Sequence, residues 1–311
     1  MSFRSRQLPY VAEDEYGIQG GHPVMSISSG IRIYGNATAI ITGAASGIGR
    51  ALAQELVARG CEVVLADLQI EQAEEVAVAL REAGGKATAA WLDVTDHAKF
   101  EQLVKDTVAR TGRLDYLFNN AGISHGMGAG ARHYRIEDWR RMIDVNVVGV
   151  VNGVQAAYNL MIDQGFGHIV NTASLAGLVP SAGTTSYVTT KHAVVGLSHN
   201  LRIEAAQLGV RVSVLCPGVI RTPLIEGGVY GRSVEGVTRE MTRDLWEEQK
   251  PISPEEFVKK SLDAVARNKG IIVVPAFWKA FWWLFRLSPT LCVNIATKKF
   301  RDLGRSETSG V

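Results

Sequence analysis

The sequence is poor in cysteine and has no excess of charge of one sign. Its 311 residues include three cysteines, Cys61, Cys216 and Cys292, in no paired pattern, so we expect buried thiols in a reducing, cytoplasmic compartment. No cluster of His, Cys and carboxylate residues has the spacing of metal ligands, so a metal is not implied. The net charge is +2 with both signs interspersed, which argues against nucleic acid as a partner.

The composition is that of a folded protein with one large core. Hydrophobic residues make up 46% and charged residues 21% of the chain, which favours a single α/β domain with appendages. Residues 1–36 have no hydrophobic period and no apolar stretch of signal-peptide type, so we expect a flexible extension there. We expect the main folded domain over residues 37–275 and an aromatic-rich C-terminal extension over residues 276–311.

Helices and strands alternate regularly from Ala37 onward. Strand-like runs at Glu62–Asp67 and Lys86–Leu92 alternate with helical runs at Ile70–Ala83 and Ala98–Arg110. This repetition predicts a Rossmann-type, doubly wound parallel sheet of about seven strands, with helices on both faces in three α/β/α layers. The other expected elements are strands Leu114–Phe118, His168–Ala173, Val210–Leu215 and Ile271–Val274 and helices Ile136–Asp163 and Ser186–Gln207.

A glycine-rich turn follows the first expected strand and opens the first helix. Gly43 permits a tight turn, Gly47 lets a pyrophosphate approach the backbone, and Gly49 lets the helix pack on the strand. The helix N-terminus offers its N–H groups to the phosphates. A glycine-rich turn alone is a weak signal, since it is also a common tight connection. The residues expected to bind a cofactor here are Gly43, Ser46, Gly47, Ile48 and Gly49.

Asp67 ends the second expected strand, about twenty residues after the glycine turn. A carboxylate at this position binds both hydroxyls of the adenosine ribose and repels a 2′-phosphate. No arginine or lysine lies between Gly43 and Gly47 or directly after Asp67. The sequence therefore predicts selectivity for NAD over NADP.

Several polar and small residues lie just past the ends of apolar runs. In a doubly wound sheet the carboxyl ends of the strands line one crevice, so residues far apart in sequence converge there. Turn chemistry and helix capping are the alternative explanation for each of them. The residues concerned are Asp93 with Val94, Asn120 with Ala121 and Gly122, Ser174, and Pro217 with Gly218 and Val219.

A serine, a tyrosine and a lysine occur together between Asn171 and Lys191. Tyr187 and Lys191 are four residues apart at the start of an expected helix, so their side chains share one face. The ammonium group should favour the phenolate and lower the pKa of Tyr187 toward the range of an acid/base catalyst. Ser174 follows a strand and can hold a carbonyl or alcohol oxygen. The alternative is a half-exposed helix face without a catalytic role.

Asn146 lies among apolar neighbours within the expected helix Ile136–Asp163. A buried amide needs hydrogen-bond partners, and a core asparagine bonded to backbone is the simplest explanation.

With these motifs assembled, the chain resembles the classical short-chain dehydrogenase/reductase family over about Ala37 to Val274. Thr42–Gly49 resembles the family's cofactor turn, and Asn119–Gly122 resembles its structural signature after the fourth strand. By the same resemblance Asp93 contacts adenine, and Pro217, Gly218 and Thr222 meet the nicotinamide carboxamide. The positions that match the family's catalytic tetrad are Asn146, Ser174, Tyr187 and Lys191.

The resemblance implies a mechanism for these residues. Ser174 binds the substrate oxygen and Tyr187 exchanges its proton. Lys191 acidifies Tyr187 and binds the nicotinamide-ribose hydroxyls, while Asn146 anchors a water molecule between Lys191 and solvent. The family also forms dimers or tetramers, and the apolar content of the two longest expected helices agrees with a homo-oligomer. Members that reduce carrier-bound 3-oxoacyl groups end soon after the last strand, whereas this chain continues, which argues against such a substrate.

We therefore expect an NAD-dependent oxidoreductase that interconverts a secondary alcohol and its ketone. A bulky apolar substrate, such as a steroid, terpenoid or aryl alcohol, is favoured. A polar or sugar-like alcohol is the alternative within the enzyme class. A catalytically silent NAD-binding regulator is a further alternative, since the fold does not guarantee activity.

Two segments outside the motifs carry further expectations. Residues 219–252 are mixed in glycine and charge and form an expected substrate loop. Large aromatic residues crowd into Phe277–Phe285, in an apolar run shorter than the roughly 20 residues that cross a bilayer. This run packs on the protein's own core or on a neighbouring subunit, forms a wall of the substrate site, or lies on a membrane surface. We favour a substrate-site wall with peripheral membrane contact.

Overall fold

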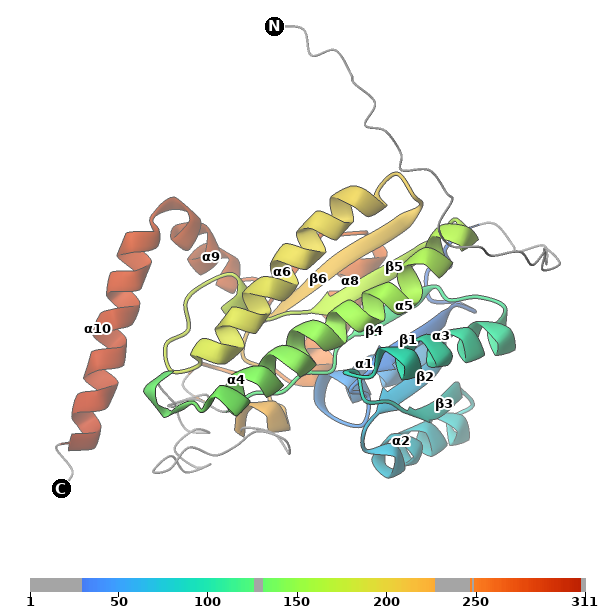
Figure 1. The fold of residues 1–311 in the computed structure, drawn as a ribbon, viewed down its shortest axis with the longest axis horizontal. Coiled ribbons are helices and arrows are strands. Elements are labelled where there is room, and N and C mark those ends of the chain that lie inside the picture. The colour runs from blue at the N-terminus through green and yellow to red at the C-terminus, as the bar shows by residue number, and fades with distance from the viewer. Residues whose placement is uncertain (1–29, 126–130, 227–246, 248, 309–311) are drawn as a thin grey trace, which may run out of the picture.

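The computed structural model describes residues 30–125, 131–226, 247 and 249–308, and its centre is a seven-stranded parallel sheet (Figure 1). The strand order is β3-β2-β1-β4-β5-β6-β7. The strands are β1 Thr38–Thr42, β2 Glu62–Asp67, β3 Lys86–Trp91, β4 Tyr116–Asn119, β5 Gly167–Thr172, β6 Val210–Pro217 and β7 Ile271–Val274. The order reverses direction at β1 and β4, as in a doubly wound sheet, so the expected fold is confirmed.

Helices cover both faces of the sheet. The α-helices within the described domain are α1 Gly47–Ala58, α2 Ile70–Glu82, α3 His97–Thr111, α4 Ile136–Ile143, α5 Gly149–Gln164, α6 Thr185–Ala205 and α8 Pro254–Ala266. Helices α1, α2 and α8 contribute to the core on one face, and α3, α5 and α6 to the core on the other. Neighbouring strand residues alternate between the two cores: Ile41 packs into the first and Ile40 into the second. The central strands β1 and β4 are buried along their whole length because helices cover both faces, whereas the edge strand β3 has exposed residues.

The long helix expected over residues 136–163 is interrupted by a short π-helix. Helix α4 passes through η2, Asp144–Val148, into α5, and η2 is the π-helical segment. The stretch Ile136–Gln164 has the length and apolar content of a membrane-crossing helix. However, Val154, Ala157 and Met161 pack into the core beside the sheet, which accounts for that apolar content.

The last residues of the expected flexible extension are packed on the domain. Tyr34 is 4% exposed, and its hydroxyl donates to the carbonyl of Leu262 at 2.5 Å. Its ring stacks on that of Tyr116, with ring centroids 5.3 Å apart. The expectation of flexibility is therefore wrong for residues 31–36, because Tyr34 is buried in the core and Ile31 packs against it; residues 1–29 lie outside the described part of the chain.

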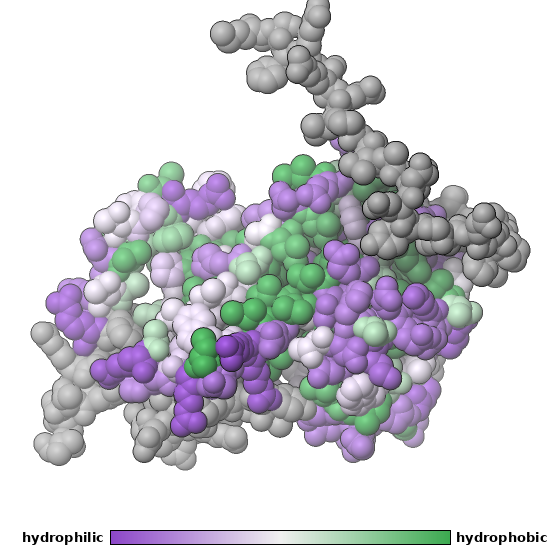
Figure 2. Space-filling model, in the orientation of Figure 1, coloured by the Kyte–Doolittle hydropathy of each residue, from purple (hydrophilic) through white to green (hydrophobic). Residues whose placement is uncertain are grey.

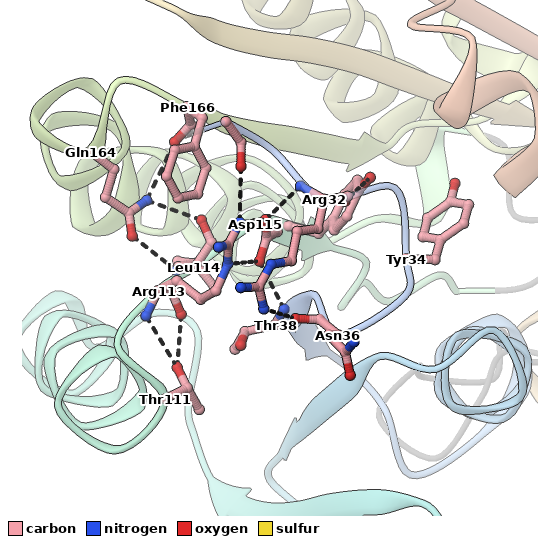
Figure 3. A network of polar contacts seen from close by, with 12 residues as sticks. Arg32, Tyr34, Asn36, Thr38, Thr111, Arg113, Leu114, Asp115, Gln164 and Phe166 are labelled. Carbon is pink, nitrogen blue, oxygen red and sulfur yellow. Dashed lines mark hydrogen bonds and ion pairs between the residues drawn. The ribbon is translucent and has the colours of Figure 1, made fainter. Parts of the chain in front are cut away.

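A buried ion pair fixes the end of the sheet opposite the strand carboxyl ends (Figure 3). Asp115 is fully buried and accepts hydrogen bonds from Arg113, Nη2 to Oδ1 at 2.6 Å and Nε to Oδ2 at 2.7 Å. The same carboxylate accepts the backbone N–H groups of Arg32 and Thr38, each at 2.9 Å. Asp115 thereby joins the N-terminal segment to β1 and β4 at the end of the sheet opposite the strand carboxyl ends.

Two helices follow the last strand, α9 Trp278–Leu287 and α10 Pro289–Thr308. Trp278, Phe281, Trp282 and Phe285 of α9 pack against a third cluster of buried residues beside β6 and β7. Figure 1 shows α10 standing away from the sheet beyond the end of α6.

Candidate active site

Ser174, Tyr187 and Lys191 are brought together where β5 ends and α6 begins. Ser174 begins the short 3-10 helix η3, Leu175–Gly177, and its Oγ accepts from the N–H of Ala176 at 3.1 Å. A Cβ atom added to Gly177 would lie 2.5 Å from the carbonyl oxygen of Lys191. Gly177 therefore permits a backbone contact between η3 and α6 that larger residues would prevent, and this contact holds Ser174 beside Tyr187.

Lys191 is buried against the sheet and points toward Tyr187. It is 3% exposed, its Nζ donates to the carbonyl oxygen of Thr172 at 3.0 Å, and this Nζ lies 5.4 Å from the centroid of the Tyr187 ring. Thr172 is the last residue of β5. The backbone of the strand thus orients the ammonium group.

Burial dominates the ionisation of both groups. It raises the pKa of Tyr187 to about 12, against the opposing effect of a hydrogen bond with Ser174. It lowers the pKa of Lys191 to about 8. The expectation that Lys191 brings the pKa of Tyr187 below that of a free phenol is therefore wrong for this structure, because desolvation outweighs the opposing effects. At neutral pH the pair consists of a protonated phenol and a buried ammonium ion.

Asn146 is fully buried in the π-helical segment η2. Its Oδ1 accepts from the N–H of Ile123 at 2.8 Å, and its Nδ2 donates to the carbonyl of Ile123 at 3.0 Å and to Thr190 Oγ1 at 3.1 Å. Asn146 thus bonds to backbone, as the simplest explanation expects, and also to the residue that precedes Lys191. Single-turn π-helices often occur at functional sites.

The glycine turn after β1 leaves open space beside its backbone at the N-terminus of α1. Gly43 and Gly47 have φ values of +65° and +52°, which favour glycine. A Cβ atom added to Gly49 would lie 2.0 Å from the carbonyl oxygen of Gly43, so glycine is required for α1 to pack this closely. Ser46 is the N-cap of α1 and makes no side-chain cap bond. An open turn at a helix N-terminus fits the pyrophosphate of a dinucleotide.

Asp67 and Asp93 lie at the carboxyl ends of β2 and β3. Asp67 Oδ2 accepts from the N–H of Ala45 at 2.9 Å, and Oδ1 accepts from the N–H of Gln69 at 3.0 Å. These bonds orient the carboxylate at the edge of the glycine turn. Asp93 accepts from the N–H and hydroxyl of Thr95 at 2.9 and 2.8 Å, a turn-forming role of the kind weighed above.

The segment after β4 joins this strand to β1. Asn120 Nδ2 donates to the carbonyl of Thr42 at 3.0 Å, and the N–H groups of Asn120 and Ala121 both donate to Thr42 Oγ1 at 3.0 Å. A Cβ atom added to Gly122 would lie 3.4 Å from Lys191 Nζ. Val94, which follows β3, is buried and has an apolar side chain. Its backbone carbonyl accepts a hydrogen bond from Asn152 Nδ2 at 2.9 Å.

The segment after β6 closes the crevice from the other side. Strand β6 extends two residues beyond the expected end, so Cys216 and Pro217 lie in the strand. Gly218 donates its N–H to the carbonyl of Val274 at 2.9 Å. Thr222 reaches the glycine turn, where a Cβ atom added to Gly47 would lie 3.2 Å from Thr222 Cγ2. Two motifs 175 positions apart in the chain therefore meet at one site.

A cavity of about 420 Å³ opens beside Ser174 and Tyr187. Its lining includes Pro217, Gly218, Val219 and Thr222 of the segment after β6, and Ile48 of the glycine turn. The apolar wall is made by Leu175, Val179, Leu224, Ile225, Trp278 and Phe281. The aromatic segment is thus a wall of this cavity, as favoured from the sequence. Most of the expected substrate loop, residues 227–246 and 248, lies outside the described residues.

Several lining or supporting residues carried no usable sequence signal. Thr172 acts through its backbone carbonyl, and Thr190 lies in an ordinary helical pattern. Ser124 lines the cavity from the loop after β4, and Ile295 and Ala296 line it from α10. The roles of these residues depend on how elements distant in the sequence pack together. The hydrophobic periodicity of the sequence does not show this packing.

Comparisons with known proteins agree with this geometry. The short chain dehydrogenase family profile matches residues 37–228. The chain is 40% identical over 186 residues to a 2,5-dichloro-2,5-cyclohexadiene-1,4-diol dehydrogenase of Sphingobium indicum, covering 60% of this chain and 74% of that protein. It is 38% identical over 192 residues to a cyclohexanol dehydrogenase of Acinetobacter sp., covering 62% and 76%.

A solved structure shows the same fold with a nicotinamide cofactor bound. A short chain dehydrogenase/reductase of Burkholderia phymatum in complex with NAD superposes with a TM-score of 0.75 at 28% identity, covering 84% of this chain and 96% of that one. With these relatives and this fold, the chain belongs to the short-chain dehydrogenase/reductase family and is a nicotinamide-linked oxidoreductase acting on CH–OH groups of small molecules.

Proposed function

We propose that the protein is an NAD-dependent dehydrogenase of bulky apolar secondary alcohols, with Tyr187 as the general acid and base. The observation that supports this most is the cavity beside Ser174 and Tyr187, whose remaining wall is mainly aliphatic and aromatic. A cavity of this kind binds an apolar ring through burial and orients it through few polar groups. The curated relatives named above are dehydrogenases of ring alcohols, which agrees with this substrate class.

The residues of the site divide the chemistry between them. Ser174 donates a hydrogen bond to the carbonyl oxygen, and Tyr187 transfers its proton to that oxygen when the ketone is reduced. In alcohol oxidation Tyr187 takes the proton back. The charge on Lys191 stabilises the phenolate that remains after proton transfer. When bound, the nicotinamide cofactor accepts or supplies the hydride at the carbon atom.

Burial of Tyr187 and Lys191 gives the pair a defined resting state. The pKa of Tyr187 is about 12, so the phenol holds its proton at neutral pH and is ready to act as an acid. Phenolate formation becomes favourable as the proton is transferred to a developing alkoxide. Asn146 and Thr190 support the turn of α6 that carries Lys191, and we propose that Asn146 positions this lysine and a water molecule behind it.

The remaining site residues fit a dinucleotide. Gly43, Ser46, Gly47, Ile48 and Gly49 provide the backbone and helix N-terminus for the pyrophosphate. Asp67 offers its carboxylate to the adenosine ribose and disfavours a 2′-phosphate, which supports NAD rather than NADP. The residues proposed to meet the adenine and nicotinamide portions are Asp93, Val94, Asn120, Ala121, Gly122, Pro217, Gly218, Val219 and Thr222.

Initial rates across a panel of alcohols test the substrate class. Purified protein with NAD should oxidise cyclohexanol-like, terpenoid, aryl or steroid alcohols more efficiently than sorbitol or other polyols, measured as kcat/KM from NADH formation. The same panel with NADP tests the cofactor. Turnover confined to polyols would contradict the apolar assignment, and no turnover of any alcohol would favour the silent regulator.

We also propose a homodimer or homotetramer formed through α4, α5 and α6. Large apolar side chains on α4, η2 and α6 face solvent in the single chain, among them Ile143 at 39%, Val148 at 39% and Ile203 at 74% exposure. Exposed apolar groups gathered on neighbouring helices are typical of subunit contacts. Light scattering at micromolar concentration should give a mass at least twice that of one chain, and a monomeric mass would refute this.

A further inference from the structure

Helix α9 is apolar on both of its faces. Its inner face, Trp278, Phe281, Trp282 and Phe285, packs on the domain. Its outer face consists of Phe277, Trp283, Leu284 and Leu287, which are 59%, 56%, 37% and 80% exposed. A surface helix normally turns polar residues to water. In α9 only Lys279 and Arg286 are charged, and both are exposed between the two apolar faces. Among the residues that the structure describes, none covers this outer face.

Helix α10 extends this exposed apolar character. Leu291, Val293 and Ile295 are 47%, 46% and 50% exposed. Figure 1 shows that α10 stands off the domain, with α9 joining it to β7. In the space-filling view a few apolar residues appear at this end of the molecule among hydrophilic ones (Figure 2). The two helices thus form an apolar projection rather than an isolated exposed side chain.

The positive charge of this projection distinguishes between two possible partners, a second copy of the chain and a lipid surface. Between Trp278 and Arg301 the sequence contains Lys279, Arg286, Lys298, Lys299 and Arg301 and no aspartate or glutamate. The whole chain has a net charge of only +2, so the rest of the chain is net negative. Two copies packed through this surface would place like charges together, which is unfavourable. An anionic lipid surface instead attracts every basic residue of the segment.

The side chains have the chemistry of a membrane interface. The guanidinium carbon of Arg286 lies 5.6 and 5.7 Å from the ring centroids of Trp282 and Trp283. Tryptophan and arginine together suit the headgroup region, where the ring is buried and the charge stays hydrated. Helix α9 has 10 residues, a length of about 15 Å at 1.5 Å per residue, which is too short to span a bilayer and suits a helix lying in its interface.

We propose that α9 and α10 dock the enzyme on an anionic lipid bilayer through the outer face of α9. The same two helices line the cavity beside Tyr187 through Trp278, Phe281, Ile295 and Ala296. Docking therefore places the cavity next to the lipid phase, from which apolar alcohols partition. The docking itself does not depend on the proposed substrate class, because vesicle binding is measured without turnover.

Vesicle flotation of the full-length protein tests the proposal. Wild type should float with phosphatidylcholine vesicles containing 30% phosphatidylglycerol, bind pure phosphatidylcholine more weakly, and lose binding as salt increases. The double variant Trp283→Glu/Leu287→Glu should reduce binding at least tenfold. Trp91 is a comparably exposed tryptophan, at 49%, on the opposite edge of the sheet, so Trp91→Glu is the matched control and should bind as wild type.

A charge variant separates lipid binding from misfolding. Lys279→Gln/Arg286→Gln leaves the apolar contacts of α9 intact and should weaken binding to anionic vesicles about thirtyfold, given roughly 1 kcal/mol per basic residue at an anionic surface. Thermal melting in the presence of NADH should be unchanged in this variant.

Three results would overturn the proposal. One is the absence of wild-type binding to anionic vesicles at low salt. The second is a fall in mass by light scattering for Trp283→Glu/Leu287→Glu with vesicle binding unchanged, which would identify a second copy as the partner of the outer face. Quenching of wild-type tryptophan fluorescence by brominated anionic lipids gives a readout that needs no variant, and its absence would also contradict docking.

Discussion

Replacing Lys191 by methionine should make the protein more stable while abolishing turnover. The ammonium group is 3% exposed, and burial lowers its pKa from 10.5 to about 8. Each pKa unit corresponds to about 1.4 kcal/mol, so holding the charged form in the folded state costs about 3 kcal/mol at pH 7. Methionine fills nearly the same volume without a charge, but it loses the hydrogen bond to the Thr172 carbonyl, worth about 1 kcal/mol. We expect a net gain of about 2 kcal/mol in the free energy of unfolding.

The pH dependence of this gain follows from proton binding. Because the folded-state pKa of Lys191 lies below its unfolded value, the unfolded chain binds more protons between about pH 8 and 10.5, and wild-type stability rises across that window relative to the variant. The advantage of Lys191→Met is therefore complete below pH 8 and disappears toward pH 10.5. Below pH 8 both states are protonated, so the difference is constant there.

Urea unfolding at pH 7 and pH 10, at one protein concentration and without cofactor, measures this difference. Lys105 provides a control, since its side chain is 66% exposed on α3 and Lys105→Met should change stability by less than about 0.5 kcal/mol. A Lys191→Met variant no more stable than wild type at pH 7, or equally stabilised at pH 10, would refute the reasoning.

Three further predictions concern the site and the fold. Tyr187→Phe should lower kcat by about two to four orders of magnitude while NADH binding, followed by fluorescence titration, stays nearly unchanged; substantial turnover would exclude Tyr187 as the proton donor. Asp67→Ser should weaken NAD use and relax discrimination against NADP, and a wild-type preference for NADP in side-by-side kinetics would contradict the role of Asp67. Asp115→Ala leaves Arg113 buried without its carboxylate and should cost about 3–5 kcal/mol of unfolding free energy; a change below 1 kcal/mol by urea unfolding would show that the ion pair is not essential.

The order of elements and most of the site motifs could be read from the sequence. Periodicity identified strands and helices because a chain buried on both faces of a parallel sheet leaves near-continuous apolar strands and amphipathic helices. The requirement for glycine at position 49 was also readable, because packing of a helix on a strand leaves no room for a Cβ atom. Such local rules determined the fold class and the family.

The sequence was less informative where an outcome depends on contacts between distant segments. Residues 31–36 have no period of their own, and the burial of Tyr34 results from a contact with Leu262 more than two hundred residues away. Asn146, in the interrupted turn of the helix, likewise forms hydrogen bonds with Ile123 from another part of the chain.

The ionisation of the Tyr187 and Lys191 pair shows this division most clearly. The spacing of four residues correctly placed the two side chains on one face of α6, because helix geometry is local. The direction of the pKa change was wrong, because it depends on how much water the surrounding elements exclude. Desolvation is the largest cause of both changes: it raises the pKa of Tyr187 and lowers that of Lys191, and the tertiary structure alone determines it.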